Sequence, residues 1–263
     1  MTRIDQRFAD LKAKGQQGFV AYITAGDPDL ETTRQLVLEL DRRGVDVVEL
    51  GVPFSDPLAD GPVIQKATQI ALENGITVKK SLEAVAELRR RGVDIPLVLM
   101  GYYNPMLAYG LEKFVSDAQS AGADGFIIPD LPPEESEEFE SLNSDLPLIR
   151  MLAPTTPPER METVARGAKG FIYLVSVTGV TGARQSLAEG LGELIASVRQ
   201  QSSVPVCVGF GIGTPEQAQS VGALADGVIV GSACVRAIGE SNTPVETARE
   251  FARSFSGALK KID

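Results

Sequence analysis

The stretch Val48–Pro62, with the sequence VELGVPFSDPLADGP, contains the residues of this chain best suited to proton transfer. Glu49 lies within an apolar run, and a carboxylate in a buried strand is costly unless it is paired or used. A loop rich in Gly, Pro and Asp follows and ends with Asp60. A second carboxylate on this loop reaches the same pocket from a different environment, which is how two identical groups provide an acid and a base. We therefore predict an acid–base site formed by Glu49 and Asp60.

Each acidic residue in this stretch also has a structural explanation. A buried partner can neutralise Glu49, and Asp56 and Asp60 can cap the helix expected at Val63–Glu73. We favour the cap for Asp56 and the chemical role for the other two. Tyr173 precedes a Gly-rich stretch and has two interpretations, a core residue or a residue with a polar role, since a buried hydroxyl needs a hydrogen-bond partner.

Gly-containing stretches follow three apolar runs late in the chain. They are Val177–Ala183, Gly209–Gly211 and Gly231–Ser232. Glycines let the backbone approach an anion closely, and N–H groups at a helix start point toward it. One such stretch is typical of an ordinary turn, but three in successive loops predict a phosphate site. The loop 177–184 is also of a type that closes over a bound phosphate and excludes water.

Several larger side chains lie near the ends of the apolar runs. Together they are wide enough to line a pocket for an aromatic ring. They are equally typical of a packed core, so both interpretations stay open. The set comprises Tyr22, Met100, Tyr102, Ile127 and Phe210.

The elements that position these residues alternate regularly along the chain. Eight apolar runs are candidate strands, and they are continuous rather than alternating, as in strands buried on both faces. They are Gly18–Thr24, Val45–Val52, Pro96–Tyr102, Gly125–Pro129, Pro147–Leu152, Gly170–Val175, Val204–Val208 and Gly227–Val230. The helical segments between them include Leu30–Arg43, Val78–Arg91, Leu111–Ala121, Pro133–Leu142, Pro158–Arg166, Leu187–Gln200, Pro215–Val221 and Thr247–Lys261. Glycines expected to adopt the left-handed conformation end four helices: Gly44, Gly92, Gly122 and Gly167.

Eight β–α units in 263 residues predict a closed (β/α)8 barrel, the TIM-barrel architecture, formed as one domain by residues 1–263. An extra N-terminal helix at Arg3–Lys14 is expected to close the bottom of the barrel. The alternative is a doubly wound open sheet, which normally carries a G-x-G-x-x-G turn after its first strand, and Thr24–Asp27 is not such a turn. Barrels of this kind have their active site at the carboxyl ends of the strands, where Glu49 and the Gly-containing stretches fall.

Composition narrows the chemistry further. The chain has no His, a net charge of −10 and two cysteines. The lack of His excludes Ser-His-Asp catalysis and His metal sites, and no carboxylate cluster has the spacing of a metal site, so we predict no metal. The acidity disfavours nucleic acid and anionic membranes as partners. No apolar run approaches the ~20 residues of a membrane helix, and the charged N-terminus lacks a secretory signal, which favours the cytoplasm.

Motifs along the whole chain resemble those of the tryptophan synthase alpha subunit family. The most specific are VELGVPFSDPLADGPVIQ (Val48–Gln65), YLVSVTGVTGAR (Tyr173–Arg184), VGFGI (Val208–Ile212) and VGSACV (Val230–Val235), with AYITAGDPD (Ala21–Asp29) and MGYYNP (Met100–Pro105). The resemblance implies a (β/α)8 barrel that cleaves indole-3-glycerol phosphate to indole and glyceraldehyde 3-phosphate, a lyase reaction of L-tryptophan biosynthesis. It implies no cofactor in this chain.

The resemblance also implies a partner. This is a tryptophan synthase beta subunit, which binds pyridoxal phosphate and receives indole through a tunnel in an alpha2beta2 heterotetramer. The loops Pro53–Asp60 and Val177–Arg184 are expected to signal between the subunits.

Individual residues match the family's functional positions. Glu49 matches the general acid–base that protonates the indole ring carbon and takes the proton from the substrate's side-chain hydroxyl. Asp60 matches the carboxylate at the indole N–H, Tyr173 the tyrosine packed against the substrate, and Thr181 the loop threonine that hydrogen-bonds Asp60 on closure. The phosphate site is matched by Gly182, Gly211, Gly231 and Ser232. The indole pocket is matched by Tyr22, Thr24, Met100, Tyr102, Ile127 and Phe210.

Small departures from the family pattern fall near the indole pocket. Tyr22 and Met100 stand where Phe and Leu are expected, and Pro129 replaces a smaller residue. Two other functions stay open, namely a phosphosugar isomerase or epimerase with the same phosphate loops and a non-catalytic barrel that activates a partner. A metal-dependent epimerase would need His, and a non-catalytic barrel has no need of both Glu49 and Asp60.

Overall fold

The computed structural model describes residues 1–142, 145–176, 184–209 and 211–260. Within these residues, eight parallel strands form one sheet in the order β4-β3-β2-β1-β8-β7-β6-β5. They are β1 (Gly18–Thr24), β2 (Val47–Gly51), β3 (Leu97–Met100), β4 (Gly125–Ile127), β5 (Arg150–Leu152), β6 (Ile172–Val175), β7 (Val206–Gly209) and β8 (Gly227–Val230). The N–H of Phe126 in β4 donates to the Pro147 carbonyl, and the N–H of Ile149 donates to the Phe126 carbonyl. The sheet therefore closes on itself, which confirms the (β/α)8 barrel and excludes the open sheet.

The strands are apolar on both faces because they lie between the barrel interior and the surrounding helices. Every residue of β1 and of β2 is buried. In the parallel register, Glu49 of β2 lies beside Tyr22 of β1 on one side and beside Val98 of β3 on the other. Glu49 is thus held in the centre of the sheet on rigid strands.

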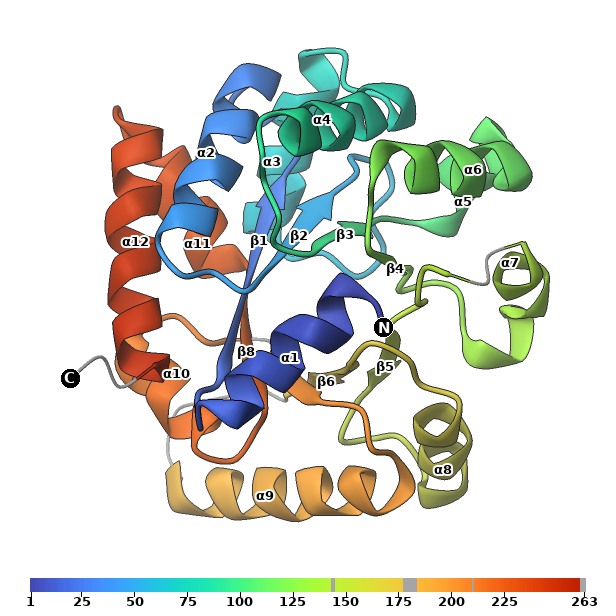
Figure 1. Ribbon diagram of the computed structural model, residues 1–263, viewed down its shortest axis with the longest axis vertical. Coiled ribbons are helices and arrows are strands. Elements are labelled where there is room, and N and C mark those ends of the chain that lie inside the picture. The colour runs from blue at the N-terminus through green and yellow to red at the C-terminus, as the bar shows by residue number, and fades with distance from the viewer. Residues whose placement is uncertain (143–144, 177–183, 210, 261–263) are drawn as a thin grey trace.

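Helices surround the barrel, with α12 and α9 along two of its sides in Figure 1. The described helices are α1 (Arg3–Ala13), α2 (Leu30–Arg42), α3 (Pro62–Glu73), α4 (Val78–Arg90), α5 (Tyr103–Tyr109), α6 (Leu111–Ala121), α7 (Glu137–Ser141), α8 (Pro158–Arg166), α9 (Arg184–Gln201), α10 (Pro215–Gly222), α11 (Ser232–Gly239) and α12 (Pro244–Leu259). Most of the expected helices are confirmed with small shifts at their ends. Two short ones, α5 and α11, have no counterpart among the expected segments.

The helix expected at Pro133–Leu142 is wrong as a single element. The structure has a 3₁₀ turn, η1 (Pro133–Glu135), followed by the short helix α7. Ser136 joins the two, and its hydroxyl donates to the Pro133 carbonyl at 3.0 Å. Such a local side-chain bond competes with a continuous helix.

Glycines end three helices as expected, with φ near +86° at Gly44, Gly92 and Gly122. The left-handed conformation expected at Gly167 is wrong, because its φ is −91°. A Cβ at Gly167 would lie 2.4 Å from the guanidinium of Arg150, which would have to shift to make room for it.

The helix α1 closes the end of the barrel where the strands begin, as expected. The Thr2 hydroxyl accepts the Asp5 N–H at 3.1 Å, and the Asp5 carboxylate accepts the Thr2 N–H at 2.8 Å, which forms a capping box. Ile4, Phe8 and Leu11 form the buried face of the helix and pack with side chains inside the barrel. Figure 1 shows α1 lying across the front of the barrel.

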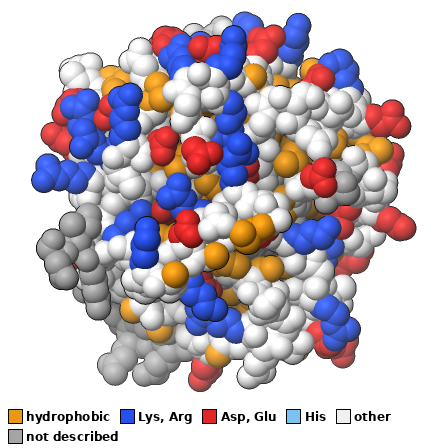
Figure 2. Space-filling view, in the orientation of Figure 1, with side chains coloured by type: hydrophobic (Ala, Val, Ile, Leu, Met, Phe, Trp, Pro, Cys, Tyr) orange, Lys and Arg blue, Asp and Glu red, His pale blue; other side chains and the backbone are white. Residues whose placement is uncertain are grey.

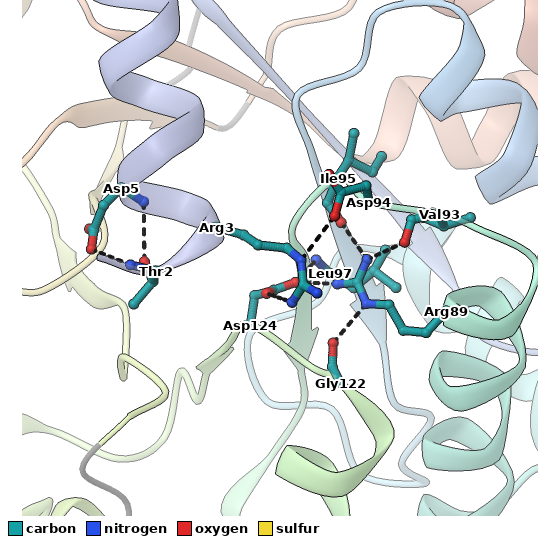
Figure 3. Close-up of polar contacts among 10 residues, drawn as sticks. All are labelled: Thr2, Arg3, Asp5, Arg89, Val93, Asp94, Ile95, Leu97, Gly122 and Asp124. Atoms are coloured by element: carbon teal, nitrogen blue, oxygen red, sulfur yellow. Dashed lines mark hydrogen bonds and ion pairs between the residues drawn. The ribbon is translucent and has the colours of Figure 1, made fainter.

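The buried carboxylate of Asp124 connects β3, α4 and α1 at this end of the barrel. Asp124 is 4% exposed and accepts the Leu97 N–H at the start of β3 at 2.8 Å. It also binds Arg89 of α4 and, at 3.0 Å, Arg3 of α1 (Figure 3). The same carboxylate-to-backbone bond recurs at two other strand starts, in the pairs Asp46–Phe19 and Asp226–Val206.

Replacing Asp124 with alanine is expected to lower the free energy of unfolding by about 3 kcal/mol, because removing one member of a buried ion pair leaves the other uncompensated. Urea unfolding followed by circular dichroism measures this loss. Asp94→Ala is the matched control, since Asp94 also binds Arg3 but is 91% exposed. A loss in Asp124→Ala no larger than in the control would contradict this account of the cluster.

Charged side chains of both signs are interspersed over the face seen in Figure 2. Within the described part of the chain, no helix is long and apolar enough to cross a membrane.

Candidate active site

A cavity of about 360 Å³ lies at the carboxyl ends of the strands, within the size range of small-molecule sites. The cavity is formed by strand residues of the barrel, by the loop before α3 and by the start of α11. The described residues that line it are Tyr22, Glu49, Ala59, Asp60, Gly61, Ile64, Met100, Tyr173, Gly211, Ile212, Gly213, Ile229, Gly231, Ser232, Ala233 and Arg236. Both predicted carboxylates and Tyr173 therefore share one cavity with three residues of the predicted phosphate site.

Glu49 is the most deeply buried acid of this cavity. It is 1% exposed, and its Oε1 atom has no hydrogen-bond partner among the described residues. Burial raises the pKa of Glu49 from 4.5 to about 8 because apolar surroundings disfavour the charged form. No described residue forms an ion pair with Glu49 that would neutralise it as a structural carboxylate. A carboxyl of this kind is suited to give and to accept a proton near neutral pH.

Asp60 has a different environment in the same cavity. It is half-buried on the loop between β2 and α3. Burial raises the pKa of Asp60, and a hydrogen bond from the Tyr102 hydroxyl opposes this effect. The Tyr102 oxygen also accepts the Ala59 N–H at 2.9 Å, so Tyr102 holds the loop segment that carries Asp60.

The side chains of Asp56 and Asp60 do not cap α3. The N-cap residue is Gly61, which is followed by a proline and makes no side-chain cap bond. The helix cap expected for Asp56 is therefore wrong. Asp56 is exposed and accepts a hydrogen bond from the neighbouring Ser55 hydroxyl. The side chain of Asp60 does not cap α3 either, so the structural explanation offered for Asp60 is also wrong.

Two buried tyrosines reach the cavity, each across a glycine of the next strand. A Cβ built on Gly51 would lie 2.1 Å from the Tyr22 hydroxyl, and one on Gly209 would lie 2.6 Å from the Tyr173 hydroxyl. Burial, followed by the proximity of Glu49, raises the pKa of Tyr173. The two glycines thus leave the space that the phenol groups of Tyr22 and Tyr173 occupy.

Replacing Gly51 with alanine is expected to lower the free energy of unfolding by about 1–3 kcal/mol, because the new methyl group overpacks the ring of Tyr22. Thermal unfolding measures the loss. Adding Tyr22→Leu removes the clashing ring and is expected to restore most of the stability. If the double variant were no more stable than Gly51→Ala alone, the clash with Tyr22 would not be the cause.

The start of α11 supplies backbone donors to the cavity. The N–H of Val235 donates to the Gly231 carbonyl at 3.1 Å, so the N–H groups of Ser232 and Ala233 precede the first helical bond and have no acceptor within the helix. Gly211, on the loop after β7, has a φ of +73°. These groups form the kind of site that binds an anion without a lysine or arginine.

Of the other predicted site residues, some line a cavity and others pack beside it. Met100 lines the main cavity and, with Tyr22 and Asp60, a smaller adjoining one that Tyr102 and Pro129 also line. Thr24 is buried and donates to the Tyr22 hydroxyl at 3.4 Å, and Ile127 packs inside the barrel. Thr181, Gly182 and Phe210 lie outside the described residues.

Residues that the sequence analysis missed complete the cavity. Ile64 follows the predicted loop on the first turns of α3, and Ile229 lies two residues before Gly231 on β8. Ile64 lies within the motif Val48–Gln65 and Ile229 directly precedes the motif Val230–Val235, so both could have been predicted as cavity residues. Arg236 lies on α11, a helix that was not predicted. No sequence signal therefore indicated that Arg236 faces the cavity.

Fold and site together define a class of protein, a (β/α)8 barrel with two carboxylates and a set of backbone donors in one cavity at the carboxyl ends of its strands. The described residues contain no cluster of three or more His, Cys, Asp or Glu that would hold a metal ion. The family model described as "Tryptophan synthase alpha chain" matches residues 8–262. The chain belongs to the tryptophan synthase alpha chain family.

Individual relatives agree with this assignment. The tryptophan synthase alpha chain of Chloroflexus aggregans is 52% identical, and the match covers 100% of both chains. Among solved structures, tryptophan synthase subunit alpha from Legionella pneumophila has a TM-score of 0.89 and 41% identity, covering 100% of each chain. A chain of tryptophan synthase from M. tuberculosis has a TM-score of 0.89 and 33% identity, covering 99% of each. The expected family is therefore confirmed, and the chain is an enzyme subunit of tryptophan biosynthesis.

Proposed function

We propose that this chain cleaves indole-3-glycerol phosphate to indole and glyceraldehyde 3-phosphate by a retro-aldol reaction, and that it is a lyase. The observation that carries the proposal is the buried Glu49, a carboxyl of raised pKa in the cavity that Asp60 shares. Membership of the tryptophan synthase alpha chain family supports the same reaction independently.

Glu49 performs two proton transfers in this mechanism. An aromatic carbon is a poor leaving group, so the ring carbon that bears the side chain must first be protonated, which converts the indole to an indolenine. The neutral carboxyl of Glu49, favoured by burial, donates this proton. The carboxylate that remains takes the proton from the substrate hydroxyl. The carbon–carbon bond then breaks, its electrons return to the ring, the carbonyl of the aldehyde forms, and Glu49 is neutral again.

Asp60 stabilises the positive charge that the ring nitrogen acquires when the ring carbon is protonated. Its half-buried position and its bond from Tyr102 keep it in a more polar environment than Glu49. The two carboxyl groups therefore have separate tasks, with Glu49 starting neutral and Asp60 starting ionised.

The remaining predicted residues bind the two ends of the substrate. We propose that Gly211, Gly231 and Ser232 hold the phosphate, together with Gly182, and that Thr181 binds Asp60 when the loop closes. The indole ring contacts Tyr173 and the predicted pocket residues Tyr22, Thr24, Met100, Tyr102, Ile127 and Phe210.

The chain is also proposed to act with a partner. Residues 1–263 form one barrel domain that assembles with a tryptophan synthase beta chain into an alpha2beta2 complex. Pyridoxal phosphate belongs to the beta chain, and this chain uses no cofactor of its own. The name of the family, which designates one chain of a synthase, supports a second chain.

Incubation of the purified chain with indole-3-glycerol phosphate tests the reaction. Equal amounts of indole and glyceraldehyde 3-phosphate are expected, and release is expected to rise when a tryptophan synthase beta chain is added. A folded chain that releases no indole with or without the beta chain would overturn the proposal and favour an isomerase or a non-catalytic activator.

A further inference from the structure

One charged residue of the cavity has no part in the mechanism above. Arg236 lies on α11 and lines the cavity with Gly213, Ser232 and Ala233. Residues four positions apart share one face of a helix, and helical side chains lean toward the N-terminus. Arg236 therefore shares a helix face with Ser232, and its guanidinium is expected to lean toward the start of α11, where the phosphate is proposed to bind.

A positive charge near the start of α11 would favour binding of a phosphate in this acidic cavity. Among the described lining residues Arg236 is the only base, whereas Glu49 and Asp60 are both acids. The proposed substrate brings a phosphate dianion into the same space, and the chain as a whole has a net charge of −10. Backbone N–H groups provide only partial charge, so a charge-assisted hydrogen bond from a guanidinium adds a strong contact that they cannot supply.

Arg236 is also available for such a contact. Most arginines whose side chains the structure describes are engaged in ion pairs, for example Arg89 with Asp124 and Arg249 with Glu39. Arg236 and Arg253 form none with another described residue. Both are exposed, but only Arg236 lines the cavity.

We propose that Arg236 is a phosphate-binding residue that makes this site prefer phosphorylated substrates. This inference rests on the proposed function, since it concerns the phosphate of that substrate. Arg236 contacts the end of the substrate that does not react, so it contributes to binding in the ground state and in the transition state equally. Its loss therefore raises KM and leaves kcat nearly unchanged.

Steady-state kinetics of Arg236→Gln test the proposal. The KM for indole-3-glycerol phosphate is expected to rise about 10-fold, the loss typical of one charge-assisted hydrogen bond, with kcat within about 2-fold of the parent chain. Arg236→Lys keeps the charge and is expected to recover part of the loss. Arg253→Gln removes the same charge from α12, away from the cavity, and is expected to leave KM unchanged.

Binding of inorganic phosphate, measured by calorimetry, separates this inference from the proposed reaction. Weaker phosphate binding by Arg236→Gln than by Arg253→Gln supports the inference even if no indole is released. Indole release with an unchanged KM and unchanged phosphate binding in Arg236→Gln would overturn the inference and leave the proposed function intact. An equal rise of KM in both variants would also overturn it, because a general loss of charge would then explain the effect.

Discussion

Replacing Glu49 with glutamine is expected to lower the rate of indole-3-glycerol phosphate cleavage by about 10³-fold or more, since one general acid–base contributes typically 10²–10⁴-fold and Glu49 serves in both directions. Glutamine has nearly the same shape but neither donates an acidic proton nor accepts one. The rate of indole release in the presence of a beta chain measures the loss.

The fold is expected to survive this substitution. Glu49 forms no ion pair with a described residue and its Oε1 atom is unpartnered, so its loss leaves no buried charge behind. Glu73→Gln, an exposed acid at the end of α3, is the control and is expected to keep full activity. Near-normal turnover by folded Glu49→Gln would mean that another group transfers the protons.

The same substitution is expected to change the pH dependence of stability. The pKa of Glu49 is about 8 in the folded chain, against an ordinary value of 4.5, so between these pH values the folded state holds a proton that the unfolded chain has lost. The contribution of Glu49 therefore makes the free energy of unfolding fall as pH rises from about 4.5 to about 8. Glu49→Gln is expected to remove this part of the decline, which urea unfolding at several pH values measures.

Replacing Asp60 with asparagine is expected to lower the rate of cleavage by about 10²-fold, because the positive charge that develops on the indole nitrogen loses its counter-charge. The loss is smaller than for Glu49, since the proton transfers at carbon and at the hydroxyl remain. Single-turnover indole release measures the chemical step free of product dissociation.

Asp56→Asn is the matched control for this experiment. It makes the same change on the same loop, but Asp56 is exposed and does not line the cavity, so the rate is expected to stay within about 2-fold. Equal rates for both variants would reduce Asp60 to a loop residue without a chemical role.

Much of the fold could be predicted from the sequence because the local signals agree with the tertiary structure. The strand Gly18–Thr24 was predicted with its observed bounds, since a continuous apolar run ends at a Gly-Asp-Pro turn. The helix α11 could not be predicted in the same way. It begins directly after β8, has only eight residues and lacks a side-chain cap, so its periodicity was too short to separate from the preceding strand.

The candidate site, like the fold, could be predicted from the sequence only in part. Glu49 and Asp60 were predictable because their loop has an unusual composition and a specific motif. The contact of Tyr102 with Ala59 joins residues 43 positions apart, and the parallel pairing of β2 with β3 brings them together. The sequence therefore predicted Tyr102 only as a pocket residue. It did not predict that the Tyr102 hydroxyl also positions the loop of Asp60. Arg236 depends on an element that was not predicted, so its place in the cavity was not predictable either.

The most direct test of the central claim is the rate of indole release from indole-3-glycerol phosphate, measured with a beta chain from pH 6 to pH 10. A neutral, buried Glu49 as the first proton donor predicts a rate that falls as pH rises past about 8, and this fall is expected to follow the pKa of Glu49. A rate that continues to rise through pH 9, or the absence of indole at every pH from a folded chain, would contradict the account.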